Sequence, residues 1–293
     1  MTRPSKPRRS CLYMPGTNSR ALDKARSLDS DVIIMDLEDA VAPESKALAR
    51  EQVMVAVAEG GYGHREVWIR INPLASVWGA EDLLMAVAAQ PDGIVIPKVD
   101  DADDIRVVNE ALRSANIHSD TRLWAMIESP RAVLNLDSIA ETGAITRLAG
   151  LIFGGNDLAK ALGITVSADR LALQHSLSMI VLACRANALT AIDGVFNQIN
   201  DAEGLEAECI QGKAFGFDGK TAIHPSQLDI CNRCFSPSNE ELEHAQQIVA
   251  AFSQSANANA GVLQVNGQMV ERLHFEQAQQ LLARQKALTE RSV

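Results

Sequence analysis

The feature that most constrains the fold of this chain is a repeated alternation between short apolar runs and longer segments with helical spacing. The runs are rich in β-branched residues and nearly continuous in apolar side chains, as at residues 32–35 and 151–153. Such runs suit parallel strands covered on both faces, because a strand with one wet face would alternate. The eight runs are residues 11–15, 31–38, 66–72, 93–99, 122–128, 148–154, 190–195 and 216–224.

The segments between these runs carry helical spacing and helix start signals. Pro43 suits a first helical position, and Asp101 and Asp103 favour the positive end of a helix dipole. The expected helices are residues 19–28, 43–59, 81–89, 103–114, 132–139, 168–187 and 202–214. Eight right-handed βα units close most simply into a barrel. An open doubly wound sheet is the alternative, but no G-x-G-x-x-G follows the first run.

These patterns predict an α/β protein, a (β/α)8 TIM barrel over residues 11–236, with a basic N-terminal arm at residues 1–10. Residues 237–293 add no βα unit. They read as a helix over 238–252, a polar stretch, an apolar run at 262–265, a turn at Asn266-Gly267 and a final helix over 268–289. We expect this C-terminal helical extension to pack on the barrel or on a neighbouring subunit.

Composition excludes several classes of protein. Lys plus Arg number 27 against 37 for Asp plus Glu, a net charge of −10, so a nucleic-acid partner is not expected. No apolar run approaches the roughly 18 residues that a membrane span needs. The apolar stretch after the basic start is broken at Pro15-Gly16, which disfavours a signal peptide. Five irregularly spaced cysteines are no disulfide framework, so a cytoplasmic protein is expected.

Two carboxylates stand where barrel enzymes place their chemistry, at the ends of strands. Glu128 and Asp157 each follow an apolar run, and the two runs should be neighbours in the barrel. Unpaired carboxylates there would be costly, so they favour a bound cation. Oxygen ligands in an open, wet site suit Mg²⁺, with Mn²⁺ as the other option. The alternative is that both residues cap the helices that follow them.

Arg70 is the natural partner for an anion at the same end of the barrel, because its guanidinium offers forked donors. The alternative is an inert ion pair with Glu38. Strand alternation predicts that Asp36 and Glu38 point one way while Leu37 and Asp39 point the other, so one pair only should face the mouth.

The remaining polar candidates are weaker. Lys98 and Lys220 could contact phosphate or neutralise nearby acids, and the second interpretation is favoured. His224 has no Ser or Cys partner in a recognisable motif, and neither H-E-x-x-H nor G-x-S-x-G occurs, which disfavours a nucleophilic hydrolase. The lone CxxC formed by Cys231 and Cys234, on an expected short helix, disfavours redox or zinc chemistry because no second pair exists.

Seven segments in order resemble the citrate lyase β-subunit-like family of acyl-CoA lyases, within the aldolase/citrate lyase superfamily. They are residues 12–16, 36–41 together with Lys46 and Arg50, 69–72, 96–99, 127–128, 156–158 and 216–226. Each segment alone is weak, but seven in register are specific for the family and much less specific for the substrate.

The resemblance implies a barrel that uses a divalent metal, usually Mg²⁺, to cleave a 3-hydroxyacyl thioester into an acetyl thioester and a 2-oxo acid. By position in the motifs, Glu128 and Asp157 look like the metal carboxylates that also bind substrate. Arg70 looks like the substrate-binding and catalytic arginine. From their places at strand ends, Glu38, Lys98 and Lys220 are candidate accessory residues.

The resemblance also implies a homotrimer or hexamer whose C-terminal segment reaches a neighbour's active site. Glu271 stands where many relatives have Asp and is the implied acid/base; the alternative is a surface residue. The phosphates of CoA need positive charge. The candidates are Arg3, Lys6, Arg8 and Arg9 of the arm with Lys24 and Arg26, while a solvated arm is the alternative.

Within this family, the expected reaction is cleavage of (S)-citramalyl-CoA to acetyl-CoA and pyruvate. The partners are then a CoA thioester and a 2-oxo acid. One alternative is a citrate lyase β subunit that releases oxaloacetate inside a multisubunit complex, and another is a malyl-CoA lyase. A thioesterase or malate-synthase-like enzyme on the same scaffold, or a non-catalytic module, also remains open.

Overall fold

The computed structural model describes residues 6–115, 120–254 and 260–291. The chain divides into two compact units. One is the segment Arg8–Phe235, and the other comprises residues 236–291 with residues 6–7. Within the described residues, no helix is both long enough and apolar enough to cross a membrane.

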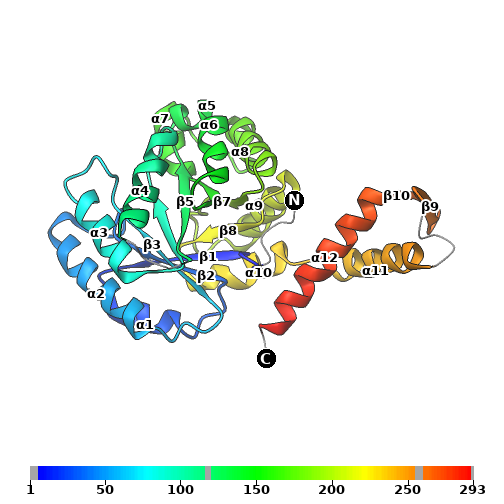
Figure 1. Ribbon diagram of the computed structural model, residues 1–293, viewed down its shortest axis with the longest axis horizontal. Coiled ribbons are helices and arrows are strands. Elements are labelled where there is room, and N and C mark those ends of the chain that lie inside the picture. Colours follow the sequence, from blue (N-terminus) through cyan, green and yellow to red (C-terminus); the bar gives the residue numbers. More distant parts are fainter. Residues whose placement is uncertain (1–5, 116–119, 255–259, 292–293) are drawn as a thin grey trace. The chain divides into compact units, whose positions relative to one another are not determined.

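The first unit is a closed barrel of eight parallel strands in the order β1 to β8, with β8 paired to β1 (Figure 1). All eight predicted runs are confirmed as strands. The strands are β1 (Ser10–Pro15), β2 (Val32–Asp36), β3 (Glu66–Arg70), β4 (Gly93–Ile96), β5 (Arg122–Ile127), β6 (Leu148–Phe153), β7 (Thr190–Asp193) and β8 (Gly219–Ala222). β8 begins three residues later than predicted because Gly216, in the left-handed region at φ 101°, ends the preceding helix.

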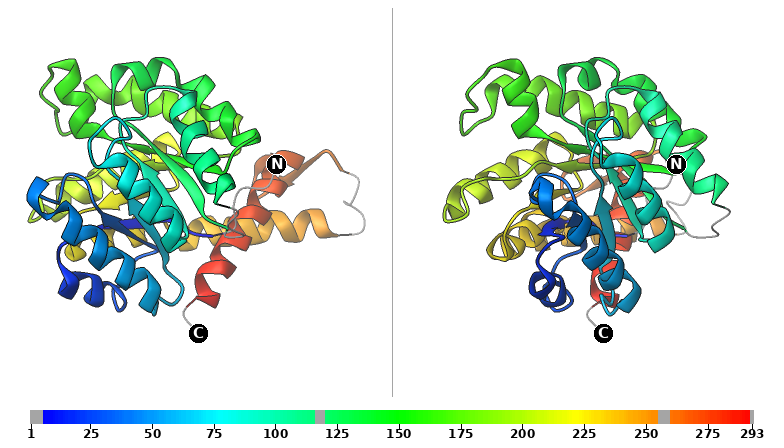
Figure 2. Two further views of the ribbon diagram at one scale, coloured as in Figure 1. Left: turned by 60° about the vertical axis from the view of Figure 1, so that its left-hand side comes forward. Right: turned by 90° about the vertical axis from the view of Figure 1, so that its left-hand side faces the viewer.

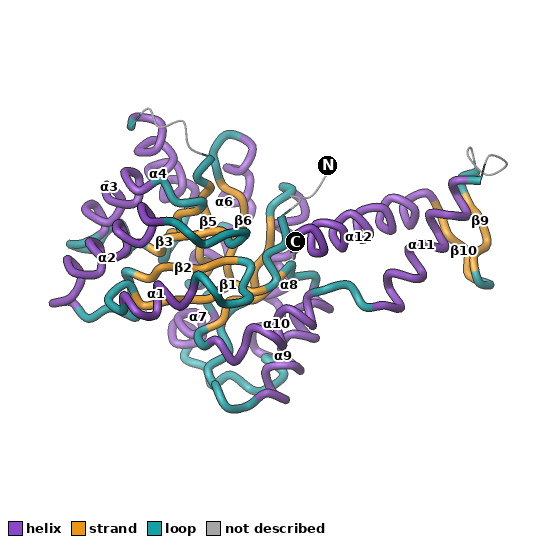
Figure 3. Tube along the Cα trace, turned by 90° about the horizontal axis from the view of Figure 1, so that it is seen from below, coloured by secondary structure: helices purple, strands orange, loops and turns teal. Residues whose placement is uncertain are grey.

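Helices form the outer layer of the barrel in every view (Figures 2 and 3). They are α1 (Ser19–Ala25), η1 (Pro43–Ser45), α2 (Lys46–Glu59), α3 (Gly79–Ala89), α4 (Ala102–Ser114), α5 (Pro130–Leu134), α6 (Leu136–Glu141), η2 (Thr142–Ala144), α7 (Gly155–Leu162), η3 (Leu171–Leu173), α8 (Gln174–Ala186), α9 (Ala202–Phe215), η4 (Pro225–Gln227) and α10 (Leu228–Phe235). The single helix predicted over 132–139 is wrong, because the chain breaks at Asn135 into α5 and α6. α7 was not predicted.

Two apolar cores fill this unit. The larger lies between the strands and the helices, and the smaller fills the inside of the barrel. In the smaller core Trp68 and Trp124 stack with ring centroids 3.9 Å apart, and the guanidinium of Arg8 lies 4.9 Å from the Trp124 ring. Trp68 precedes Arg70 by two residues on β3, so the tryptophan pair packs beneath the residues at the strand ends.

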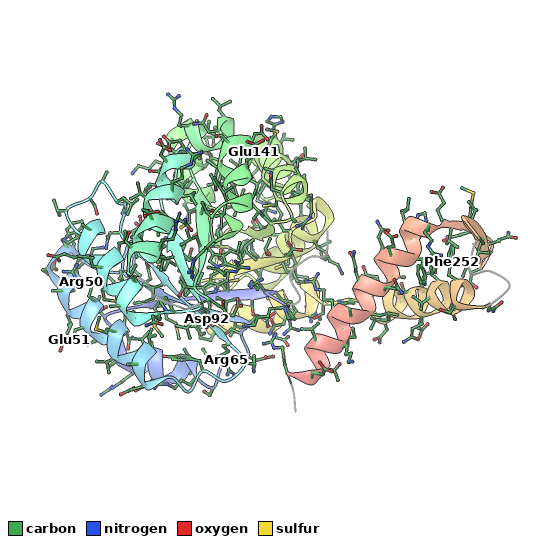
Figure 4. All side chains as sticks on the ribbon, in the orientation of Figure 1. Arg50, Glu51, Arg65, Asp92, Glu141 and Phe252 are labelled. Atoms are coloured by element: carbon green, nitrogen blue, oxygen red, sulfur yellow. The ribbon has the colours of Figure 1, made fainter. Side chains whose placement is uncertain are left out.

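The second unit contains α11 (Asn239–Ser253), β9 (Val262–Val265), β10 (Gln268–Glu271) and α12 (Arg272–Glu290). Its core includes Phe252, whose ring centroid lies 5.3 Å from that of Phe275 (Figure 4). The prediction of a helix from residue 268 is wrong, because residues 268–271 pair with β9 as a hairpin. Asn266 and Gly267 both have positive φ, the geometry of a two-residue type I′ turn.

Candidate active site

A cavity of about 330 Å³ opens where the strands of the barrel end. Four carboxylates line it, those of Asp36, Asp39, Glu128 and Asp157. Among the described residues that line the cavity, Arg70 is the one with a full positive charge. Barrel enzymes carry their chemistry at this end of the strands, so the cavity is the candidate active site.

Arg70 is fixed in the cavity by Asp36 on the neighbouring strand. The two residues are partners in the β2–β3 register. Arg70 Nε donates to Asp36 Oδ1 at 2.7 Å and Arg70 Nη2 donates to Asp36 Oδ2 at 2.6 Å, a forked pair between buried side chains. The guanidinium carbon lies 4.6 Å from the centre of the Tyr13 ring. Arg70 is therefore held on two sides.

Glu38 is also at the mouth, as the alternation predicted. Its Oε2 lies 3.0 Å from Arg70 Nη1 but has no hydrogen-bond partner among the described residues. Burial raises the pKa of Glu38 to about 8, against the opposing effect of Arg70. The Arg70–Glu38 contact that the sequence offered as an alternative is therefore present, next to the forked pair with Asp36.

The same alternation is wrong for Asp39. Leu37 is buried in the core between strands and helices, as expected, but Asp39 lines the cavity and lies 3.4 Å from Arg70 Nη1. β2 ends at Asp36, so the two-residue period no longer decides where the side chains beyond it point.

Glu128 and Asp157 are brought together around one ammonium group. Lys98 Nζ lies 3.4 Å from Glu128 Oε1 and contacts Asp157 Oδ2, and the Lys98 backbone N–H donates to Glu128 Oε1 at 2.6 Å. Burial raises the pKa of Glu128, while Lys98 opposes that shift. Neither carboxylate caps the helix after it, because Ser129 and Gly154 are the N-cap residues of α5 and α7.

Glycine is required beside Glu128. A Cβ built on Gly154 would overlap the Cβ of Glu128 and lie 2.7 Å from its Oε2. The absence of a side chain at Gly154 therefore lets the end of β6 approach Glu128 closely. The start of α7, which carries Asp157, is placed against Glu128 in this way.

The donor set fits a hard divalent cation with few protein ligands. No group of three or more His, Cys, Asp or Glu residues in the described part of the chain is arranged to hold a metal. Two oxygen ligands beside an open cavity are what Mg²⁺ takes when it keeps several waters. The ammonium of Lys98 between Glu128 and Asp157 shows that a cation suits this position.

Lys220 lies outside this cavity. Its side chain is fully buried, with Nζ 3.2 Å from Asp193 Oδ2 and 2.6 Å from Glu208 Oε1. Arg170 Nη1 lies 2.8 Å from Asp193 on the same cluster. Lys220 thus neutralises acids between the strands and α9 and is not placed to contact a ligand in the cavity.

Three other candidate residues of the barrel unit, His224, Cys231 and Cys234, do not line the cavity. His224 caps η4, with Nδ1 2.8 Å from Ser226 Oγ. Cys231 and Cys234 are free thiols on α10, and the Sγ of Cys231 lies 3.9 Å from that of Cys209. Glu271 is the N-cap residue of α12 in the second unit, where its backbone N–H donates to His274 Nδ1 at 2.9 Å.

Two arginines of the basic arm already pair with carboxylates. Arg8 is buried and pairs with Glu66 at 2.6 Å, and Arg9 pairs with Asp31 at 2.8 Å. Arg26 of α1 pairs with Glu59 at 2.8 Å. These three arginines already have carboxylate partners. Lys6 and Lys24 are exposed, and Arg3 lies outside the described residues.

Two residues of the site were not identified from the sequence. The run pattern places Asp36 at a strand end without pairing it with Arg70, although adjacent parallel strands put their last residues side by side. Tyr13 was seen only within a motif. Both are found by asking which side chains share the last inward-facing layer of the barrel.

Comparison with known proteins agrees with this geometry. A model of the HpcH/HpaI aldolase/citrate lyase family matches residues 9–225. A (3S)-malyl-CoA thioesterase of Cereibacter sphaeroides is 46% identical over 288 residues, which is 98% of each chain. The citrate lyase subunit beta of Haemophilus influenzae is 33% identical over 96% of this chain and 97% of its own.

Two further proteins extend the comparison. The mitochondrial citramalyl-CoA lyase of Homo sapiens is 30% identical over 93% of this chain and 84% of its own. The crystal structure of the CitE protein of Mycobacterium tuberculosis in complex with magnesium, acetoacetate and coenzyme A is 27% identical with a TM-score of 0.77. That match covers 96% of this chain and 99% of the CitE chain. With the family model spanning most of the barrel, this chain belongs to the HpcH/HpaI aldolase/citrate lyase family.

Proposed function

We propose that this chain is a metal-dependent enzyme that hydrolyses the thioester of a malyl-CoA-type substrate, a 3-hydroxyacyl-CoA with one free carboxylate. The observation that carries the substrate class is the charge of the cavity: Arg70 is its one cationic lining residue among those described, and Asp36 already engages it. The metal would take the one free carboxylate of a malyl-type substrate and Arg70 the thioester oxygen. The second free carboxylate of a citryl thioester would then meet no further cation among the described lining residues. The 46% identity to enzymes named (3S)-malyl-CoA thioesterase supports hydrolysis.

Glu128 and Asp157 are the residues that would hold Mg²⁺, and Mn²⁺ suits the same ligands. When bound, such a metal polarises the substrate oxygens that it contacts and neutralises their charge. The magnesium in the CitE complex of Mycobacterium tuberculosis supports this proposal.

Arg70 is proposed to donate hydrogen bonds to the oxygen of the thioester carbonyl. Attack of water at that carbonyl carbon forms a C–O bond and places negative charge on the oxygen. Collapse breaks the C–S bond and releases CoA thiol and the free acid. Arg70 is preorganised for that charge by Asp36 and Tyr13. Removing one such donor typically lowers kcat by about a hundred- to a thousandfold.

The second candidate is the carbon–carbon lyase, with (S)-citramalyl-CoA giving acetyl-CoA and pyruvate. The apolar part of the cavity lining favours it, because Met126, Phe153, Val195 and Ile223 would suit the extra methyl group. Arg70 would then stabilise the thioester enolate that forms as the carbon–carbon bond breaks. In both reactions Arg70 donates to the thioester oxygen. Hydrolysis breaks the C–S bond after attack by water, whereas the lyase reaction breaks a carbon–carbon bond.

Glu271 is proposed to supply a proton-transfer carboxylate from a neighbouring subunit, in a homotrimer or hexamer. Glu271 keeps the carboxyl of the Asp that the family resemblance implies at this position but moves it by about one methylene, a displacement that can change the rate by about a hundredfold. Glu271→Gln is expected to lower turnover without changing the melting temperature, and unchanged turnover would remove Glu271 from this role.

A product assay tests the proposed function. Purified protein is incubated with malyl-CoA, citramalyl-CoA and HMG-CoA, with Mg²⁺ or with EDTA, and free thiol and 2-oxo acid are followed separately. We expect free thiol from malyl-CoA, no 2-oxo acid, and no product with EDTA. A 2-oxo acid without free thiol would establish the lyase instead. Neither product with Mg²⁺ present would contradict both candidates, and Arg70→Lys serves as the inactive control.

A further inference from the structure

Lys98 adopts a backbone conformation that its residue type disfavours. β4 ends at Ile96, and Lys98 is the second residue after it, following Pro97. Its φ of 52° lies in the left-handed region. Side chains with a Cβ avoid this region because Cβ approaches the carbonyl oxygen, so such a residue is held there by its surroundings. The contacts that hold Lys98 are its own backbone N–H and its own ammonium, and both go to the carboxylate of Glu128.

The ammonium of Lys98 lies among three carboxylates. Its Nζ contacts Asp157 Oδ2, lies 3.4 Å from Glu128 Oε1 and lies 3.9 Å from Glu38 Oε1. Glu128 and Glu38 are buried, with side chains 2% and 6% exposed. The carboxylates of Glu128 and Asp157, when both are ionised, repel each other unless a cation stands between them, and Lys98 provides that charge.

We propose that Lys98 is a built-in counter-ion of the divalent metal site. Its ammonium holds Glu128 and Asp157 together when no divalent cation is present and competes with that cation for Asp157. This inference rests on the proposed role of Glu128 and Asp157 as metal ligands. Lys98 then lowers the affinity of the metal site while keeping its carboxylates assembled.

The competition follows from the atoms involved. A divalent cation between Glu128 and Asp157 would lie close to the ammonium that contacts Asp157 Oδ2, and the two positive charges repel each other, so a bound metal favours displacement of Nζ. Solvent is available to receive the displaced ammonium, because the Lys98 side chain is 41% exposed. The backbone N–H can stay on Glu128 Oε1, so that carboxylate keeps its orientation as the ammonium leaves.

If Lys98 only positioned the carboxylates, its removal would change the metal affinity in the opposite direction. If the ammonium merely kept the carboxylates in place, its removal would let Asp157 turn away and would weaken metal binding. Under competition, its removal tightens metal binding. The direction of the change in affinity therefore separates the two.

The experiment measures Mn²⁺ binding to the full chain without substrate, by electron paramagnetic resonance of the free ion. Lys98→Met removes the charge and keeps most of the side chain. Lys98→Asn removes the charge with a residue that tolerates positive φ. Lys160→Met, at an exposed position on α7, is the matched control for loss of one positive charge.

Both Lys98 variants are expected to bind Mn²⁺ at least about tenfold more tightly than the parent, and Lys160→Met to bind it as the parent does. The metal-free Lys98 variants should also melt at a lower temperature than the parent, with the difference closing at saturating Mn²⁺. Unchanged or weaker binding by both Lys98 variants would overturn the proposal.

The metal assignment itself is tested in the same titration with Glu128→Gln. One possible result is that the parent binds Mn²⁺, Glu128→Gln abolishes this binding, and the Lys98 variants bind no more tightly than the parent. That result would contradict the counter-ion role of Lys98 and would support the metal site. If the parent binds no Mn²⁺, or if Glu128→Gln binds Mn²⁺ as tightly as the parent does, Glu128 is not a metal ligand. The counter-ion role of Lys98 is then contradicted as well.

Discussion

Arg70 and Asp36 face each other at the ends of adjacent strands, joined by two parallel hydrogen bonds of 2.7 and 2.6 Å. Asp36 also accepts from the backbone N–H groups of Glu38, at 2.9 Å, and Ala40, at 3.1 Å. One carboxylate therefore orients the guanidinium and shapes the turn after β2. Its four contacts place Asp36 at the centre of the site, although it would not itself touch the reacting carbon.

Asp36→Asn is expected to lower the free energy of unfolding by about 3–5 kcal/mol. It removes the charge of the carboxylate that makes the forked pair with the buried guanidinium of Arg70, which then keeps only its longer contacts with Glu38 and Asp39. Urea unfolding measures this change. The double variant Asp36→Asn/Arg70→Met should lose less than the sum of the two single variants, because the unpaired charge has gone. Additive losses would show that the pair is not coupled.

Gly154→Ala is expected to damage the site next to Glu128. The added methyl group would overlap the Cβ of Glu128, so β6 or Glu128 has to shift, at a cost of about 1–3 kcal/mol. We expect a lower melting temperature and at least about tenfold lower turnover of malyl-CoA. Gly261→Ala is the control, because its Cβ would meet nothing within 4 Å. Parent-like turnover in Gly154→Ala would contradict the close approach.

The sequence predicted the barrel well because buried parallel strands leave continuous apolar runs. It predicted Glu128, Asp157 and Arg70 at the mouth of the barrel because the end of each apolar run marks the end of a strand. It failed where the backbone leaves a regular period: at Asp39, beyond the end of β2, and at residues 268–271, where a type I′ turn converts an expected helix into a strand. The left-handed φ of Lys98 also has no signal in its residue type, because contacts with Glu128 hold it.

The buried cluster of Asp193, Lys220 and Arg170 predicts how stability depends on pH. Burial alone would raise the pKa of Asp193, but Lys220 and Arg170 hold it below its usual value. Burial alone would lower the pKa of Lys220, but Asp193 and Glu208 hold it above its usual value. Both groups are therefore charged in the folded protein over the whole neutral range.

Because the folded pKa of Asp193 is depressed, its stabilisation is present above about pH 4 and is lost as the pH falls through the folded value. Because the folded pKa of Lys220 is raised, its stabilisation is present below about pH 10 and is lost as the pH rises through the folded value. Urea midpoints from pH 3 to 11 measure both limbs. In the double variant Asp193→Asn/Lys220→Met, the urea midpoint should change less with pH at both ends of the range. An equally steep change in that variant would show that other groups cause the pH dependence.

The stacked tryptophans inside the barrel give the last prediction. The Nε1 atoms of Trp68 and Trp124 are buried without a hydrogen-bond partner among the described residues, so the pair stabilises the barrel by ring packing and not by polar contacts. Trp124→Ala leaves a cavity and is expected to cost about 3–5 kcal/mol, whereas Trp124→Phe keeps a ring at the position and should cost about 1–2 kcal/mol. Chemical unfolding of the two variants measures the difference. Equal losses in the two variants would contradict ring packing as the source of the stabilisation by Trp124.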